Sequence, residues 1–278
     1  MRRIEYKTDG QLGWMAKAGL VTSKALDAAV AAAKPAATTA DIDAAFRQVI
    51  IENGASSNFL GYYDYPAMTC TSVNDEVVHG IPGSRQLRSG DIVSIDGGAM
   101  VQDPASGKNW NGDSARTVLL GQVSPERAEL SEVTHAALWQ GIAALAWAKK
   151  VGQIGVAIEE FVRSETGEKY GIIEDYVGHG IGSAMHMAPD VLNYAGSDLG
   201  PRLKAGMALA IEPMLVTGSI ETQVLADGWT VKTRDGGDAC QWEHSVAIHS
   251  EGIWVLTAED GGAHELGKLG VKVKPIPA

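Results

Sequence analysis

Cysteine is scarce in this chain: Cys70 and Cys240 are the only two among 278 residues, and they lie far apart. A disulfide framework is therefore not expected, and a reducing, cytoplasmic compartment is favoured. No uninterrupted apolar stretch is long enough to cross a bilayer, and the N-terminal residues lack the apolar core of a secretory signal. We therefore expect no membrane association.

Basic residues are outnumbered by acidic ones. Lysine and arginine total 23 against 34 aspartates and glutamates, which gives a net charge of −11 and a pI near 5.1. Such a charge disfavours binding to nucleic acid or to an anionic membrane. A hydrophobic content of 45% and a charged content of 21% are typical of globular proteins with a sizeable core.

Two pairs of helices are expected. An apolar period of about 3.6 residues predicts a helix over 10–33, which Pro35 ends. Thr39 is the expected N-cap of the next helix, over 40–52. In the second half, Ser124-Pro125 is expected to open a helix that runs to about Lys150, and a fourth helix is expected over 155–170.

Short β-branched segments between turn residues follow each pair of helices. The expected strands include 68–73, 91–101, 114–120 and, near the C-terminus, 253–257. The residues after the last strand are expected to form a loose tail. This order of helices and then strands, given twice, predicts an α+β fold rather than a Rossmann-like alternation.

The two halves of the chain, roughly 10–123 and 124–257, also repeat short motifs in the same order. The matched pairs are Val78-His-Gly-Ile81 with Gly178-His-Gly-Ile181, Gly90-Asp-Ile-Val-Ser-Ile-Asp96 with Gly206-Met-Ala-Leu-Ala-Ile-Glu212, and Gly112-Asp-Ser114 with Trp242-Glu-His244. Each half thus offers a histidine, a carboxylate at the end of an apolar strand, and a carboxylate at the start of another β segment.

These matched carboxylates favour a metal site. A carboxylate on a buried strand is costly unless it is paired or binds a metal. A lone Asp there is more often a turn residue, and a lone histidine between glycines is more often an exposed turn residue. Taken together, the candidate ligands are Asp96, Asp113, His179, Glu212 and Glu243. Such a set suits divalent Mn, Fe, Co or Zn, and four carboxylates indicate two ions that share ligands.

At these residues the chain resembles the bacterial type I methionine aminopeptidases, a family with the pita-bread fold. The motifs that carry the resemblance are His79-Gly-Ile-Pro82, Asp91-Ile-Val-Ser-Ile-Asp96, Gly112-Asp-Ser114, Gly178-His-Gly-Ile-Gly182, Ile211-Glu-Pro-Met214, Trp229-Thr-Val-Lys-Thr-Arg234 and Gln241-Trp-Glu-His244. They run in the family's order over most of the chain, and as a set they are specific. The resemblance implies one catalytic domain over 1–278, with helices covering a curved antiparallel sheet. A monomer is expected, because the paired halves already supply a complete site.

The resemblance also implies a role for each polar residue. Asp113 and Glu243 would bridge two metal ions, Asp96 would complete the shell of one ion, and His179 with Glu212 the shell of the other. A metal-bridging hydroxide would attack the first peptide bond of a nascent protein or peptide that begins with Met and has a small second residue. Glu212 would transfer the proton, His186 would stabilise the developing oxyanion, and His79 would contact the first peptide nitrogen or the leaving side.

By the same resemblance, the methionine side chain would bind among Tyr62, Tyr65, Cys70, Met185 and Trp229. A narrow aromatic slot with a thiol suits a thioether, because sulfur makes favourable contacts with aromatic rings. From the residues alone, ordinary core packing is the simpler explanation for Cys70, Met185 and Trp229. Tyr62 and Tyr65 differ, because they lie in a short segment bounded by glycine and proline.

The sequence departs from the family pattern at a few positions. Sixteen residues separate Asp96 from Asp113, and residues 102–109 resemble an enlarged hairpin tip. Met185 and Met187 stand where the family commonly has an aromatic residue and an acid, and Phe59 is bulkier than the usual small residue. These departures concern the shape of the pocket rather than the chemistry.

Three other classes of protein fit the sequence less well. A di-iron helical bundle would need two Glu-x-x-His motifs on helices, but Glu76-Val-Val-His79 lies in a β-branched stretch, and His135 is expected on a helix surface. Prolidases and X-Pro aminopeptidases are nearer, yet the residues before Gly61 leave no room for their extra N-terminal domain. A non-catalytic relative is disfavoured by the presence of all five ligands. A transient contact with the ribosome is left open.

Overall fold

The computed structural model describes residues 3–277. In this range the helices are α1 (Asp9–Ala32), α2 (Thr39–Glu52), the 3-10 helix η1 (Tyr62–Asp64), α3 (Pro125–Ala144), α4 (Gln153–Thr166) and α5 (Ala263–Lys268). The strands are β1 (Ser56–Ser57), β2 (Thr69–Val73), β3 (Glu76–Val78), β4 (Ile92–Gln102), β5 (Asn109–Leu119), β6 (Gly171–Ile172), β7 (Gly178–Gly180), β8 (Met187–Val191), β9 (Ala208–Ile211), β10 (Met214–Val216), β11 (Thr222–Val224), β12 (Val231–Thr233), β13 (Ala239–Gln241), β14 (His244–His249) and β15 (Gly252–Val255).

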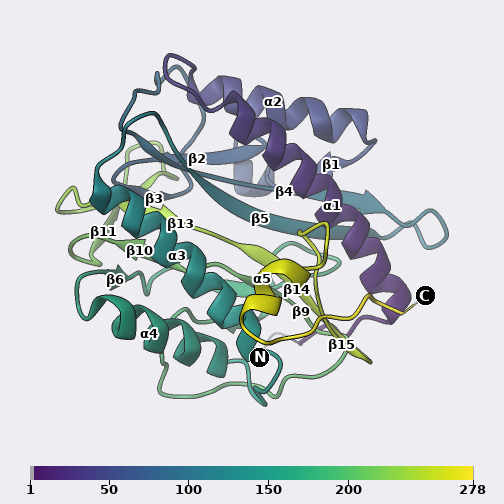
Figure 1. Cartoon of the computed structure of the whole chain (residues 1–278). Helices are drawn as coiled ribbons and strands as arrows, with labels where there is room; N and C mark the ends of the chain where they lie inside the picture. Colours follow the sequence, from purple (N-terminus) through teal and green to yellow (C-terminus); the bar gives the residue numbers. More distant parts are fainter. Residues whose placement is uncertain (1–2, 278) are drawn as a thin grey trace.

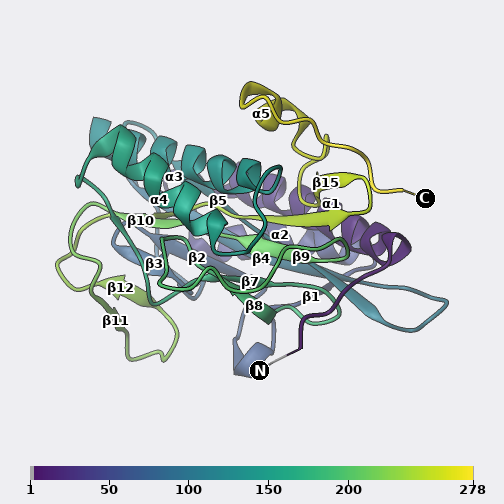
Figure 2. The same ribbon diagram turned by 90° about the horizontal axis from the view of Figure 1, so that it is seen from below.

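The long helices α1 to α4 lie on one side of the strands (Figures 1 and 2). Apolar residues of α1 and α2, such as Leu26 and Phe46, pack in one buried cluster with Ile95 of β4. In the second half, a larger cluster joins Ile142 of α3 to Leu209 of β9. Each pair of helices therefore buries apolar residues against strands of its own half, and α1 also packs Leu12 and Met15 against Ala208 of β9 and Ala247 of β14.

The strands pair antiparallel throughout. In the first half, β4 pairs with β5, β2 and β1. In the second half, the order is β15-β14-β9-β7-β8. The halves meet at two places. Strand β3 pairs with β12, and β5 runs beside the start of β14, where the Glu243 amide donates to the Ala115 carbonyl at 3.0 Å. The Asp113 amide donates to the Ser245 hydroxyl at 3.1 Å in the same seam. The predicted α+β class is confirmed.

Helix boundaries differ from the predicted ones where side chains bind the backbone. The N-cap of α2 is Thr38, not Thr39, because the Thr38 hydroxyl and Asp41 form a capping box. Helix α3 ends at Ala144 instead of continuing to Lys150. Gln153 accepts hydrogen bonds from the amides of Lys149 and Lys150 at 2.8 and 3.0 Å, which turns the chain before α4 begins. The fourth helix is accordingly 153–166 rather than 155–170.

The C-terminal tail and the β4–β5 hairpin were also predicted from the sequence. The tail predicted to be loose contains the short helix α5, which the Asp260 carboxylate starts by accepting from the amides of Gly262 and His264. Only one apolar residue of α5, Leu266, is buried, so the pattern was too short to show a helix. The expected hairpin tip is real, and β4 and β5 pair as far as Gln102 and Asn109. Within residues 3–277, no helix is both long and apolar enough to cross a membrane.

Candidate active site

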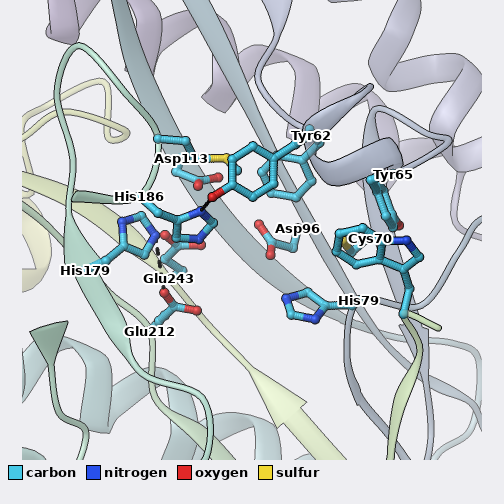
Figure 3. A pocket seen from close by; sticks show the side chains of 13 residues that line it. Tyr62, Tyr65, Cys70, His79, Asp96, Asp113, His179, His186, Glu212 and Glu243 are labelled. Carbon is cyan, nitrogen blue, oxygen red and sulfur yellow. Dashed lines mark hydrogen bonds and ion pairs between the residues drawn. The ribbon is translucent and has the colours of Figure 1, made fainter. Parts of the chain in front are cut away.

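The five candidate ligands line a single cavity of about 140 Å³. Figure 3 shows their side chains pointing toward a common space. They come from five places in the chain: Asp96 on β4, Asp113 on β5, His179 on β7, Glu212 directly after β9, and Glu243 directly before β14. The sequence halves therefore contribute two and three ligands to one site.

Strand register explains how Asp96 and Asp113 meet although sixteen residues separate them. Asp113 lies opposite Gly98 in the β4–β5 pair, and Gly98 is two residues beyond Asp96. Side chains two apart on a strand point to the same face, and directly opposed residues share a face. The two carboxylates are thus diagonal neighbours on one face. The enlarged hairpin tip lies at the far end of the same pair and leaves this register unchanged.

His179 and Glu212 are brought together on the second sheet. His179 pairs with Ala210 across β7 and β9, and its Nε2 lies 3.6 Å from Glu212 Oε1. Its Nδ1 is 3.0 Å from the Gly180 carbonyl, which accepts a hydrogen bond when this nitrogen carries the proton. Burial, with His186 nearby, lowers the pKa of His179 to about 3. The imidazole is therefore neutral, with Nε2 available as a ligand. His179 is a buried residue of strand β7, not the exposed turn residue that a lone histidine between glycines more often is.

The carboxylates are arranged as they would be around a cation. Atoms of Asp113, His179 and Glu243 that can bind a metal all lie within 4.8 Å of one another. One buried oxygen each of Asp96, Asp113 and Glu243 has no hydrogen-bond partner within the described residues. Unpaired buried oxygens are costly and need an explanation. A divalent cation supplies the missing partner, so the donor set fits a metal centre of oxygen and imidazole ligands.

The charge balance supports the same conclusion. Burial raises the pKa of Asp96 to about 7. Burial first, and neighbouring carboxylates second, also raise the pKa values of Asp113, Glu212 and Glu243 well above the usual range. Four buried carboxyl groups therefore cannot all ionise together unless positive charge binds among them. Gln241 offers some compensation by donating to Glu212 Oε2 at 3.2 Å.

His79 and His186 lie at the cavity without joining the group of ligands. His79 follows β3 with a left-handed backbone, φ 61°, a conformation that costs about 1–3 kcal/mol and is typical of functional sites. Its ring is 5.5 Å from that of Tyr176. His186 is exposed at the mouth, and its Nδ1 is 2.9 Å from the Tyr62 hydroxyl. The rings of His186 and His179 have centroids 4.1 Å apart.

An apolar slot opens beside the carboxylates. Four of its residues are buried together, namely Phe59, Tyr65, Cys70 and Met185, with Tyr62, Ile81 and Trp229 packed against them. The Tyr65 ring meets the Trp229 ring edge-on at 5.0 Å. The Tyr65 hydroxyl lies 2.9 Å from the Thr69 carbonyl and 3.1 Å from the Gly80 carbonyl, and its one proton is shared between these two acceptors, so its polar end is satisfied and its ring faces the slot. All five residues expected to bind methionine line the same cavity.

Sequence reasoning missed two residues of this site and misjudged one outside it. Phe59 lines the cavity, whereas we noted only its bulk. Gln241 supports Glu212, and its place in the Gln-Trp-Glu-His motif was the available signal. His135 is not on a helix surface. It is half-buried, its ring accepts a hydrogen bond from Trp139 Nε1 at 3.0 Å, and it meets the Trp242 ring edge-on with centroids 4.5 Å apart. Leu266 and Val271 of the C-terminal segment pack in the same apolar cluster as α3, a tertiary contact that the helix pattern could not show.

Comparisons with known proteins agree with this site. Residues 13–250 match the metallopeptidase family M24. The chain is 44% identical over 260 residues to a methionine aminopeptidase 1 of Mycobacterium tuberculosis, covering 92% of this chain and 96% of that protein. It is 39% identical to methionine aminopeptidase 1 of Bacillus subtilis, covering 90% and 98%.

Solved structures give the same result. The crystal structure of methionine aminopeptidase from Rickettsia prowazekii has a TM-score of 0.85 at 33% identity, covering 92% of this chain and all of that one. The Thermotoga maritima enzyme also has a TM-score of 0.85, at 35% identity, covering 93% and 100%. The prolidase from Pyrococcus furiosus shares the fold, with a TM-score of 0.70 at 21% identity over 91% of this chain and 65% of its own. This chain therefore belongs to metallopeptidase family M24 and, within it, to the methionine aminopeptidases.

Proposed function

We propose that this protein removes the N-terminal methionine from nascent proteins and peptides whose second residue is small. The proposal rests mainly on one observation: two features line the same cavity. One is a group of carboxylate oxygens without hydrogen-bond partners near His179, and the other is an apolar slot formed by Cys70 and aromatic rings. The carboxylates suit divalent metal ions, and the slot suits a thioether side chain. A substrate whose side chain fills the slot presents its first peptide bond to the carboxylates.

Two divalent ions, drawn from Co, Mn, Fe or Zn, would be held by the five ligands. We assign Asp113 and Glu243 as the shared ligands, Asp96 to one ion, and His179 with Glu212 to the other. Bound ions would supply Lewis acidity, which polarises a carbonyl and lowers the pKa of a water molecule. The close approach of the ligand atoms of Asp113, His179 and Glu243, all within 4.8 Å of one another, supports a metal ion held among them.

The other polar residues act directly on the substrate. Glu212 takes the proton from the attacking water and delivers it to the leaving amine, a role that contributes typically ~10²–10⁴-fold to the rate. Its position next to His179 and its hydrogen bond from Gln241 orient the carboxylate for this transfer. His186 donates to the oxyanion that develops on the scissile carbonyl, and His79 holds the first peptide nitrogen. Tyr62 fixes the His186 ring by bonding to its other nitrogen.

We further propose that the whole chain is one catalytic domain, acting as a monomer in the cytoplasm. The ligands of both halves converge on one cavity, so no second copy is needed to complete the site. Both cysteines are buried and unpaired, as expected in a reducing compartment. The predicted partners are Met-initiated polypeptides, with a transient contact with the ribosome as a further possibility to test by co-sedimentation.

A direct assay tests the proposed activity. Purified protein is incubated with Mn²⁺ or Co²⁺ and either Met-Ala-Ser or an X-Pro peptide, and released amino acids are quantified. We expect release of methionine from Met-Ala-Ser and no cleavage of the X-Pro peptide. Absence of methionine release with either metal would refute the proposal, and cleavage of the X-Pro peptide would favour a prolidase-like specificity.

A further inference from the structure

The short segment before α1 contains a lysine that the proposed reaction does not use. Lys7 is buried, with 2% of its side chain exposed, although it belongs to no ligand set. Burial lowers the pKa of Lys7 to about 8, which shows that the charged form is held at a cost. Lysine is almost never fully buried unless it is paired. Its contacts should therefore account for its position.

Those contacts join the segment Ile4–Thr8, here called the N-terminal arm, to the loop 181–186. The Lys7 ammonium donates to the Ile181 carbonyl. Glu5 accepts hydrogen bonds from the Ser183 amide at 3.1 Å and from the Ser183 hydroxyl. Lys7 and Glu5 also face each other at 3.7 Å. The arm thus binds both the beginning and the middle of the loop.

The loop connects the two histidines of the site. It starts directly after β7, which carries His179, and it ends at His186, just before β8. On its other side, Asn111 of β5 binds the Gly182 carbonyl through its backbone amide at 3.0 Å and its side chain at 2.9 Å. The loop is therefore held between a strand that leads to Asp113 and the N-terminal arm.

Gly182 shows how closely the arm approaches the loop. A Cβ atom added at Gly182 would lie 2.2 Å from Glu5 Oε1 and 2.4 Å from Lys7 Cε. Any larger residue there would displace both charged side chains. The arm is itself fixed to the turn before β9, because the Lys7 amide donates to the Gly206 carbonyl at 2.7 Å.

The arm continues toward the mouth of the cavity. In Figure 2 it leaves α1 and runs toward the short helix η1, on the side of the molecule where β7 and β8 lie. Arg3 lines a shallow hollow together with Tyr62 and His186. The arm therefore passes from the body of the protein along the loop to the rim of the site.

We propose that Glu5 and Lys7 are positioning residues that hold the loop 181–186, and through it place the His186 imidazole for the reaction. This inference rests on the proposed role of His186. The physical reason is that the loop between Gly182 and His186 is irregular, so its shape depends on contacts from outside. A displacement of about 1 Å in a catalytic group can cost roughly 10²-fold in rate.

The test combines turnover with hydrogen exchange. Replacement Glu5→Ala should lower kcat on Met-Ala-Ser by roughly 10- to 100-fold with little change in KM, because an interaction of the transition state is weakened. The Ser183 amide should exchange at least about tenfold faster, since its acceptor is gone. Lys7→Met and Gly182→Ala should act in the same direction. Asp9→Asn is the matched control, because Asp9 bonds to Ser250 and not to the loop.

A double-mutant cycle separates positioning from general damage. If Glu5 acts through His186, Glu5→Ala should lower kcat less than about twofold in a His186→Ala background. An equal loss of kcat in both backgrounds would overturn the proposal. So would an unchanged kcat in Glu5→Ala although the Ser183 amide exchanges faster, or an unchanged exchange rate of that amide.

Failure of the proposed function can be distinguished from failure of the positioning role of Glu5 and Lys7. If the wild-type protein releases no methionine, the imidazole resonances of His186 replace turnover as the readout. Glu5→Ala should then shift these resonances, while Asp9→Asn leaves them in place. The absence of a shift in Glu5→Ala would count against Glu5 as a positioning residue for His186.

Discussion

Cys70 and Asp96 are directly opposed across strands β2 and β4. The wall of the apolar slot and the wall of the carboxylate cluster are therefore the same pair of strands. A substrate side chain in the slot and a peptide bond over the carboxylates are set at a fixed separation by this pairing. Changes in the slot should then alter substrate choice, whereas changes in the carboxylates should alter turnover.

Replacing Glu212 by glutamine should abolish turnover without unfolding the protein. Glutamine keeps the shape of the side chain but cannot accept the proton, so kcat should fall by ~10²–10⁴-fold. The circular dichroism spectrum should match that of the wild type, because the fold stays intact. Glu221→Gln, at an exposed residue directly before β11, is the control and should keep full activity. Turnover near the wild-type level in Glu212→Gln would contradict the assigned role.

Metal ions should stabilise the protein through Asp113. At a free metal concentration 100 times the Kd, bound metal should raise the free energy of unfolding by about 2.7 kcal/mol. Asp113→Asn should be more stable than the wild type in chelator, because one of the crowded buried charges is removed, and it should gain little from added Mn²⁺. Thermal unfolding with and without Mn²⁺ measures both effects.

Asp190→Asn serves as the comparison for that experiment. Asp190 is exposed and pairs with His179 in the β7–β8 register, but it does not line the cavity. It should respond to Mn²⁺ as the wild type does. A metal response in Asp113→Asn equal to that of Asp190→Asn would count against Asp113 as a ligand.

Lys7 should give the stability a distinct dependence on alkaline pH. Its folded pKa is lowered from 10.5 to about 8, so between these values the unfolded chain binds more protons than the folded protein. The free energy of unfolding should therefore rise with pH across this window. Lys7→Met lacks this group. In chelator, the stability of the wild type relative to Lys7→Met should increase from pH 8 to 10.5, and a flat or falling difference would refute the effect.

Phe59 should contribute to the preference for methionine. Its ring meets Tyr65 edge-on with centroids 6.4 Å apart, and both line the slot. Sulfur–aromatic contacts contribute about 0.3–1.5 kcal/mol, and norleucine has methionine's shape without the sulfur. Phe59→Leu should therefore lower the ratio of kcat/KM for methionyl over norleucyl peptides. Phe161→Leu, on α4 away from the slot, should leave this kcat/KM ratio unchanged. An unchanged ratio in Phe59→Leu would exclude a sulfur–aromatic contact between Phe59 and the substrate methionine.

The sequence predicted the fold class and the convergence of ligands better than it predicted local geometry. Repeated motifs and apolar strands indicated Asp96 and Glu212, because a carboxylate at the end of a buried strand is costly and therefore informative. The end of α3 was missed because Gln153 binds backbone amides four and three residues earlier, a contact that no apolar period reveals. The buried environment of His135 depends on Trp242, more than a hundred residues away, and is likewise a tertiary effect.

The seam between β5 and β14 has a consequence for folding. Asp96 and Asp113 belong to one half of the chain, and His179, Glu212 and Glu243 belong to the other, so a fragment comprising either half would have an incomplete set of ligands. Ions bound by the whole set would stabilise only the joined halves and neither half alone. Metal binding should thus make the two halves unfold as one cooperative unit.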